Sequence, residues 1–274
     1  MARKIKTIME NGIDKREVGY YSTPSFVAKY LTHEMLSINP NGASVLDPAV
    51  GREELLEEFY KAGKTIDSYD IIKHCEYRMS NFCQRNFIEV YADFVNNNFF
   101  STEASHYDYM IANPPYNCHE INYIKENKKW LNCLFPVGVY NMYSIFLSAM
   151  ISMAKDGCLI GVVISDSFLT SNYHSKLREQ ILSTCSIHQI ILCPTDLFWS
   201  QHADVRTCIM ILQKGKKYQS NVLISNRPNS ISEFKDILLN HALKDVSIDS
   251  LLLKCNKVSN QILIDVNQEI VGLF

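Results

Sequence analysis

The feature that most constrains this chain is an alternation of short apolar runs with longer amphipathic stretches, which begins near residue 43. Short apolar runs are typical of strands buried on both faces, whereas the longer stretches between them are typical of helices. A chain that alternates in this way forms a mostly parallel sheet with helices on both faces. We therefore expect an α/β fold with a doubly wound, seven-stranded, Rossmann-like sheet.

The expected elements can be placed by residue number. The pattern predicts strands at 43–47, 65–71, 88–92, 107–112, 158–165, 187–193 and 207–213, and helices at 52–62, 73–85, 141–155 and 172–183. The connection at 117–140 is long for a compact domain, and such connections are usually lids or binding loops. One domain is expected over 1–214, with an N-terminal helical segment at 1–42. A small appendage is expected at 215–274, with a short strand at 222–225 and an amphipathic stretch at 231–243.

Composition excludes some classes of function. A formal net charge of −2 argues against a chain that holds a polyanion with its whole surface, although it leaves room for a local basic groove. The basic clusters at 3–6 and 125–129 are interpreted as solvated faces or as parts of such a groove. Nine cysteines without a CxxC pair favour reduced thiols and offer no metal-ligand spacing. Because we find neither a bilayer-spanning run nor a signal-peptide pattern, we expect a cytoplasmic protein without metal or membrane attachment.

The tetrapeptide Asn113-Pro114-Pro115-Tyr116 follows the apolar run at 107–112. Two successive prolines cannot extend a strand, because each lacks a backbone N–H and fixes its own φ. The strand should therefore end in a rigid turn that presents one amide and one aromatic ring. An amide oxygen accepts hydrogen bonds from an exocyclic amine, and a ring beside it stacks on a flat heterocycle. This arrangement suits methylation of a planar amine or amide nitrogen.

Acidic residues close the first three expected strands. Val45 to Gly51 joins a strand to a helix through Asp47 and a tight turn, as nucleotide-binding loops do in doubly wound sheets. Asp70 could accept both hydroxyls of a ribose, or could cap a following helix. In Asp93-Phe94 the carboxylate could accept from an adenine amino group while the ring stacks on the adenine. Asp93 could equally be a turn residue beside a core phenylalanine.

These motifs, in the order Asp47-Pro48-Ala49-Val50-Gly51, Asp93-Phe94 and Asn113-Pro114-Pro115-Tyr116, resemble those of S-adenosylmethionine-dependent adenine-N6 DNA methyltransferases. Upstream, Gly19-Tyr20-Tyr21-Ser22-Thr23-Pro24 resembles the N-terminal cofactor motif of the class that includes type I modification subunits and related type II enzymes. Downstream, Leu197-Phe198 and Val205-Arg206-Thr207 resemble the end of its catalytic domain. The resemblance spans roughly residues 19 to 214 and implies a methyltransferase catalytic domain over 1–214.

The resemblance implies a role for each matched cofactor residue. Tyr21, Thr23 and Pro24 would line the methionine end of S-adenosylmethionine. Asp47 and the backbone from Ala49 to Gly51 would hold the same region. Asp70 would bind the ribose, and Asp93 with Phe94 would bind the adenine.

The resemblance also implies a target-base site and the chemistry there. Asn113, Pro114, Pro115 and Tyr116 would form the catalytic turn, in which Asn113 and the Pro114 carbonyl accept hydrogen bonds from the adenine amine. Tyr116 would stack on the flipped adenine, and Phe198 would close its second face. The implied reaction is methyl transfer to adenine N6 in double-stranded DNA, of restriction-modification type.

Two departures from the family pattern keep alternatives open. Glu53 stands where the family turn carries a second glycine, so a bulky, charged side chain could weaken cofactor binding. Only about sixty residues follow the matched region, so a separate specificity subunit or domain is expected to read the DNA sequence. One alternative is methylation of an RNA adenine or a protein glutamine. Another is a decayed or non-catalytic subunit.

Overall fold

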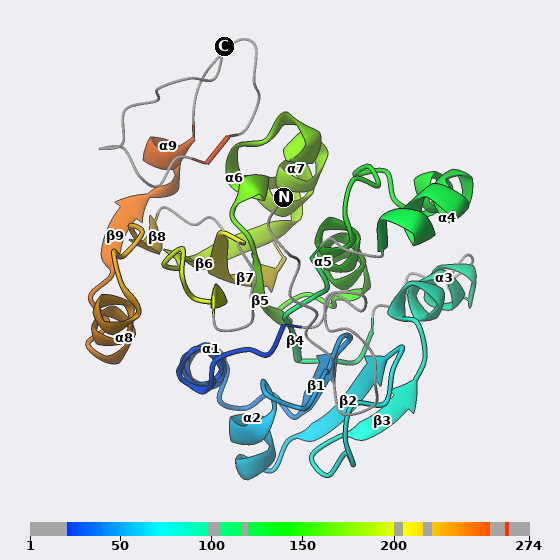
Figure 1. Cartoon of the computed structure of the whole chain (residues 1–274), viewed down its shortest axis with the longest axis horizontal. Helices are drawn as coiled ribbons and strands as arrows, with labels where there is room; N and C mark the ends of the chain where they lie inside the picture. Colours follow the sequence, from blue (N-terminus) through cyan, green and yellow to red (C-terminus); the bar gives the residue numbers. More distant parts are fainter. Residues whose placement is uncertain are drawn as a thin grey trace, which may run out of the picture.

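The computed structural model describes residues 21–97, 105–116, 120–199, 205–215, 221–252 and 261–262. Its strands are joined in one nine-stranded sheet of order β3-β2-β1-β4-β5-β7-β6-β8-β9 (Figure 1). The strands are β1 Ser44–Asp47, β2 Thr65–Asp70, β3 Asn81–Gln84, β4 Tyr109–Ala112, β5 Leu159–Ser165, β6 Cys185–Leu192, β7 Thr207–Lys214, β8 Asn221–Ser225 and β9 Lys244–Ser247.

The sheet is mixed and mostly parallel. The pairs β1–β2, β2–β3, β1–β4, β4–β5 and β6–β8 are parallel, whereas β7 runs antiparallel to both β5 and β6, and β9 antiparallel to β8. The expectation of seven strands is therefore wrong, because β8 and β9 extend the same sheet beyond residue 214. The short strand expected at 222–225 is confirmed as β8, and the amphipathic stretch at 231–243 contains the helix α8 Ile231–Leu239.

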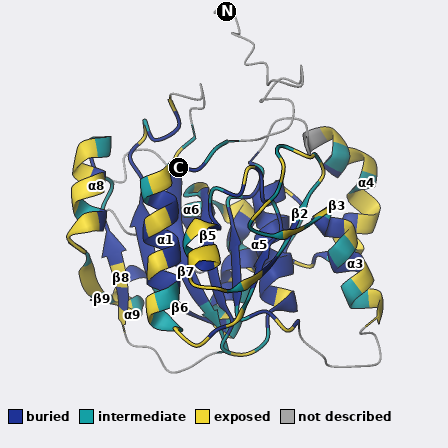
Figure 2. Ribbon diagram, turned by 90° about the horizontal axis from the view of Figure 1, so that it is seen from below, coloured by how far each residue is buried: buried dark blue, intermediate teal, exposed yellow. Residues whose placement is uncertain are grey.

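Helices cover both faces of the sheet, as expected. Helices α1 Ser25–Ile38, α2 Glu57–Lys61 and α8 lie on one face, and α3 Phe87–Asn97, α4 Glu120–Leu134, α5 Met142–Met153 and α7 Ser175–Thr184 lie on the other (Figure 1). Figure 2 shows the buried residues of α1 facing the sheet and its exposed residues facing outward. Short helices complete the described chain: α6 Ser167–Thr170, the 3-10 turn η1 Asn172–His174 and α9 Ile248–Leu251.

Side chains that alternate along the central strands supply two separate cores. Val45 packs into the core beneath α1 and α2, whereas the next residue, Leu46, packs into the core beneath α3 and α5. Every residue of α5 except Ser152 is buried, because this helix packs against both β5 and its neighbours α3 and α7. Because the central strands and α5 are buried on more than one side, their apolar residues form continuous runs in the sequence.

Two neighbouring elements differ from the sequence-based expectation. Residues 88–92, expected as a strand, lie in α3, where Ile88, Tyr91 and Ala92 are buried at helical spacing. Residues 73–85, expected as a helix, form a loop that ends in β3. β3 lies at the sheet edge with mostly exposed residues, so it has no apolar run to reveal it. The remaining six expected strands are confirmed.

The long connection at 117–140 contains a helix. Residues 117–119 lie outside the described part, and α4 occupies most of the remaining connection. In the N-terminal segment at 1–42, residues 1–20 lie outside the described part and α1 is the helix after them. Within the described ranges, no helix has both the length and the apolar character that a membrane crossing requires.

Candidate active site

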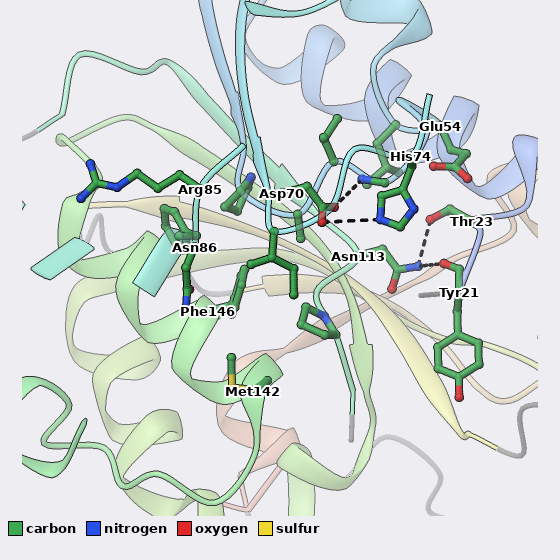
Figure 3. Close-up of a pocket in the computed structure, with 18 of the residues that line it drawn as sticks. Tyr21, Thr23, Glu54, Asp70, His74, Arg85, Asn86, Asn113, Met142 and Phe146 are labelled. Atoms are coloured by element: carbon green, nitrogen blue, oxygen red, sulfur yellow. Dashed lines mark hydrogen bonds and ion pairs between the residues drawn. The ribbon is translucent and has the colours of Figure 1, made fainter. Parts of the chain in front are cut away.

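A cavity of about 270 Å³ lies at the carboxyl ends of the central parallel strands (Figure 3). Its walls come from the turns after β1, β2, β3 and β4, from the chain before α1, and from α4 and α5. Parallel α/β sheets bind ligands at this edge. The lining residues are Tyr21, Thr23, Pro48, Ala49, Val50, Gly51, Glu54, Leu55, Asp70, Ile71, His74, Arg85, Asn86, Phe87, Asn113, Pro115, Tyr123, Met142 and Phe146.

The turn after β1 is held by carboxylates. Asp47 is buried, and its Oδ1 accepts a hydrogen bond from the backbone N–H of Ala49 at 3.0 Å. Its Oδ2 is buried and has no hydrogen-bond partner in the structure. Burial raises the pKa of Asp47 well above its ordinary value. A buried oxygen that has no hydrogen-bond partner and lies beside a cavity can accept a hydrogen bond from a ligand.

Asp70, at the end of β2, connects this turn to the cavity. Its Oδ2 accepts from the backbone N–H of Gly51 at 3.0 Å, and its Oδ1 accepts from that of Ile72 at 3.1 Å. His74 Nε2 lies 3.5 Å from Asp70 Oδ1, as the dashed line in Figure 3 shows. Because a carboxylate has about four acceptor sites, Asp70 retains capacity for a ligand hydroxyl. Gly51 adopts φ +55°, a left-handed conformation that favours glycine.

Glu53 points away from the cavity. Its Oε2 accepts from the backbone N–H of Arg78 at 3.0 Å, and its Oε1 accepts from that of Met79 at 2.9 Å and from the Ser80 hydroxyl at 2.9 Å. Glu53 itself adopts φ +64°, which explains why a glycine suits this position in the family pattern. The carboxylate therefore binds the loop before β3, and Glu53 is not among the residues that line the cavity.

Asn113, immediately after β4, has a fixed amide orientation. Its Nδ2 donates to the carbonyl of Tyr21 at 2.9 Å and to the hydroxyl of Thr23 at 3.0 Å (Figure 3). Its Oδ1 accepts from the Tyr116 hydroxyl at 2.8 Å. The two donated bonds direct the amide oxygen toward Tyr116, and the oxygen retains a second lone pair for another donor.

Tyr116 lies in an aromatic cluster behind the cavity. Its hydroxyl is also 2.7 Å from the carbonyl of Val163, and burial raises its pKa. The ring of Tyr116 is 5% exposed and lies 6.1 Å from the ring of Tyr21, 6.5 Å from that of Phe198 and 6.4 Å from that of Tyr143. The structure therefore brings Phe198, 82 positions later in the chain, beside the Asn113 turn.

The structure places Asp93 and Phe94 inside α3 and not at a strand end. The Asp93 side chain is 55% exposed and forms an ion pair with Arg85, and neither Asp93 nor Phe94 lines the cavity. The prediction that this pair closes the third strand is wrong. The residues that follow β3 are Arg85, Asn86 and Phe87, and all three line the cavity.

Asn86 joins three elements at the cavity wall. Its Oδ1 accepts from the backbone N–H of Ile88 at the start of α3, at 3.0 Å, and its Nδ2 donates to the hydroxyl of Tyr123 in α4 at 3.1 Å. The sequence contains a signal for this site, since Asn86-Phe87 is also a polar–aromatic pair. The sequence pattern does not point to it, because the pattern predicts a helix over 73–85, where β3 lies.

The other expected residues divide into two groups. Those that line the cavity are Tyr21, Thr23, Ala49, Gly51, Asp70, Asn113 and Pro115. Asp47, Pro114 and Tyr116 adjoin these residues in the chain or through hydrogen bonds, and the Pro24 carbonyl accepts from the first turn of α1. Sequence reasoning did not select Glu54, His74, Met142 or Phe146, which tertiary structure brings to the cavity. Across the described ranges, no cluster of three metal-ligating side chains is present.

Comparison with known proteins identifies the family of this chain. A family model described as N-6 DNA Methylase matches residues 9–261. The type II methyltransferase M.BanIII of Aneurinibacillus aneurinilyticus is 28% identical over 221 residues, which cover 70% of this chain and 38% of that protein. The modification methylase CviBIII of Paramecium bursaria Chlorella virus NC1A is 24% identical, over 62% of this chain and 43% of that protein.

A solved structure shares the fold. The methyltransferase subunit of a type I restriction-modification system from Streptococcus thermophilus aligns with a TM-score of 0.57 and 14% identity, covering 88% of this chain and 58% of that chain. Of the two sequence relatives named above, M.BanIII and CviBIII, this chain spans less than half the length of each. Because the family model matches most of its length, the chain belongs to the N-6 DNA methylase family.

Proposed function

We propose that this chain transfers a methyl group from S-adenosylmethionine to N6 of a flipped-out adenine in double-stranded DNA. The observation that carries the proposal is the orientation of Asn113. Its amide nitrogen is held by Tyr21 and Thr23, so the direction of its oxygen is fixed on a turn that lines the cavity. An oxygen held in this way accepts a hydrogen bond from an amine.

The residues of the cavity fit the proposed cofactor. Asp70 would accept the ribose hydroxyls, and the unpartnered Oδ2 of Asp47 would accept from a donor at the methionine end. Phe87 and Phe146 would provide apolar contact for the adenine, with Asn86 as its polar neighbour. Bound there, S-adenosylmethionine supplies an electrophilic methyl group on its sulfonium sulfur.

The chain acts on the amine through hydrogen-bond acceptors. The lone pair of adenine N6 is delocalised into the ring, so the amine is a poor nucleophile. Asn113 Oδ1 and the Pro114 carbonyl, accepting from both N6 hydrogens, would favour a pyramidal nitrogen with a localised lone pair. This contribution is positioning and electrostatic stabilisation, which needs no covalent intermediate with the protein.

Base entry requires movement of side chains. In this structure Tyr116 is packed against Tyr21 and Phe198, and its hydroxyl occupies one lone pair of Asn113 Oδ1. A base inside a duplex is unreachable, so the adenine must leave the helix to enter the site. For the adenine to stack on Tyr116, the rings of Tyr21 and Phe198 would have to separate from it.

Two further parts of the proposal concern partners. Because the curated relatives are more than twice as long as the part they share with this chain, we propose that a separate specificity subunit or domain reads the DNA sequence. We place the reaction in the cytoplasm, where bacterial-type restriction and modification act on DNA.

The decayed-enzyme alternative has lost its main support, since Glu53 binds the loop before β3. The family description also favours DNA over RNA or protein substrates.

The test combines methyl transfer with cofactor binding. Asn113→Ala should reduce transfer of radiolabelled methyl groups to unmethylated genomic DNA to background, while calorimetry shows nearly unchanged cofactor affinity. The matched control is Asn96→Ala, an exposed asparagine in α3. Mass spectrometry of the DNA identifies the product base. A wild-type chain that binds the cofactor but produces no N6-methyladenine with its specificity partner would contradict the proposal, as would an active Asn113→Ala variant.

A further inference from the structure

Two exposed tyrosines form a pair outside the cavity. Tyr140, between α4 and α5, is 57% exposed, and Tyr173, in η1, is 67% exposed. Their ring centroids lie 5.0 Å apart, with the planes inclined at 51°. Because the two rings are in contact, the pair leaves a continuous aromatic surface in water. We call Tyr140 and Tyr173 the tyrosine pair.

Buried polar residues hold the tyrosine pair from beneath. Asn141 and His174, the residues that directly follow the two tyrosines, are both buried, and Asn141 Nδ2 lies 3.2 Å from His174 Nε2. Asn141 also caps α5, because its Oδ1 accepts from the backbone N–H of Ser144 at 3.1 Å. The two chain segments that carry the tyrosines are thus joined by a hydrogen bond.

A glycine makes room for one of the two rings. Gly138 adopts φ +92°, and a Cβ added there would lie 2.6 Å from the Tyr140 ring. Any larger residue at position 138 would therefore displace that ring. Together with the hydrogen bond beneath, this packing shows that the tyrosine pair has a defined position on the surface.

The tyrosine pair is continuous with the turn that carries Asn113. The Tyr143 hydroxyl lies 2.9 Å from His174 Nε2, and the Tyr143 ring lies 6.4 Å from that of Tyr116. Tyr140 contacts His174 edge-on at 6.4 Å between ring centroids. One line of packed rings therefore runs from the exposed pair to the tyrosine that follows Asn113 and the two prolines.

We propose that the tyrosine pair binds the nucleobase next to the target adenine in the DNA strand. This neighbouring base would leave the duplex when the adenine flips out. This inference rests on the proposed function, because that function brings the DNA to this edge of the sheet. Exposed rings stack on any base, since every base has an aromatic face. Burial lowers the pKa of His174 to about 4, so the ring beneath the pair is neutral at pH 7 and offers no charge to a phosphate. The two exposed ring faces, in contact with each other, favour a stacked base over a contact with the DNA backbone.

Photo-crosslinking tests the contact without requiring turnover. Random-sequence DNA duplexes, with 5-iododeoxyuridine in place of thymidine, are irradiated with the full chain and its specificity partner. Mass spectrometry should find cross-linked peptides that contain Tyr140 or Tyr173. Cross-links that are confined to other peptides would overturn the proposal, and so would protection of the two tyrosines by the partner protein in place of DNA.

Steady-state kinetics of methyl transfer provide a second test of the tyrosine pair. Tyr140→Ala and Tyr173→Ala should each raise the KM for DNA by about tenfold, within the range for loss of one stacked base. Cofactor affinity should remain within about twofold of wild type, since neither tyrosine lines the cavity. Gly138→Ala should act in the same direction, and Tyr60→Ala, which removes a 53%-exposed tyrosine in α2, is the matched control. If the wild type methylates DNA and the KM for DNA is unchanged in Tyr140→Ala, Tyr173→Ala and Gly138→Ala, the proposed role of the tyrosine pair is overturned. The proposed function would stand in that case. An inactive wild type counts against the proposed function, and the cross-links then decide this proposal.

Discussion

The amide nitrogen of Asn113 donates a hydrogen bond to the hydroxyl of Thr23 at 3.0 Å, although the two residues are 90 positions apart in the chain. A second bond to the carbonyl of Tyr21 uses the other amide hydrogen. The segment before α1 thus sets which way the Asn113 amide faces, and the amide oxygen is directed to the site where we propose the target amine binds.

Replacement of Thr23 by valine should lower the rate of methyl transfer. Valine has a similar shape but cannot accept from Asn113, and one lost hydrogen bond of about 0.5–1.5 kcal/mol corresponds to a roughly three- to tenfold decrease in kcat. Thr23→Ser keeps the hydroxyl and should retain most of the activity. Steady-state kinetics on DNA compare the two variants. Equal loss in both would show that the methyl group of Thr23, and not its hydroxyl, supports the reaction.

Replacement of Glu53 by glycine should destabilise the protein without tightening cofactor binding. Glycine relieves the left-handed φ of this position but removes an acceptor used by Arg78, Met79 and Ser80. Since bonds to a charged acceptor contribute more than the relief of φ, we expect a net loss of about 1–3 kcal/mol in the free energy of unfolding. Denaturant unfolding measures the loss, and Glu53→Gln, which keeps part of the acceptor, should be intermediate. A glycine variant with tighter cofactor binding would restore the view that Glu53 opposes the cofactor.

Asn86, and not Asp93, should contribute to cofactor affinity. Asn86 lines the cavity, whereas the Asp93 side chain is exposed and paired with Arg85. Asn86→Ala should raise the cofactor dissociation constant roughly three- to tenfold, the equivalent of one hydrogen bond. Asp93→Ala, in the same region of the chain, serves as the control and should bind within about twofold of wild type. Calorimetry that ranks the two variants in the opposite order would return the adenine site to Asp93.

His174 should make stability depend on pH in the acid range. Burial is the main cause that lowers its pKa from 6.5 to about 4, and the nearby Arg178 adds to the effect. Between these values the unfolded chain binds a proton that the folded chain does not, so the free energy of unfolding falls as the pH drops through this window. The contribution is at most about 1.4 kcal/mol per pH unit.

Unfolding at several pH values from 7 to 4 should therefore show a smaller loss of stability in His174→Gln than in wild type. The matched control is His33→Gln, which removes an exposed histidine of α1. Identical curves for wild type and His174→Gln would mean that His174 is protonated equally in both states.

Local patterns were sufficient for much of this protein. The fold class followed from apolar runs, because a strand buried on both faces must be apolar along its whole length. The turn at Asn113 followed from two prolines that no strand interior accepts, and the structure places it directly after β4. Asp70 was expected at a strand end and lies at the end of β2.

Other features depended on which elements pack together. β3 lies at the sheet edge and needs no apolar run, so its residues resembled a helix, while α3 packs closely enough that its apolar residues resembled a strand. Because of this exchange, Asp93-Phe94 was selected in place of Asn86-Phe87. The extension of the sheet by β8 and β9 also came from pairing between distant segments, which local pattern does not specify.

Glu53 shows most clearly the difference between what the local sequence predicts and what the packing of distant segments decides. The sequence by itself determined that a non-glycine residue occupies a turn where the family pattern has glycine. Only the tertiary structure decided where the carboxylate points, because its acceptor atoms bind backbone groups 25 and 26 residues further along the chain. Turn conformation depends on neighbouring residues, whereas the partner of a buried charge depends on which segments fold against it.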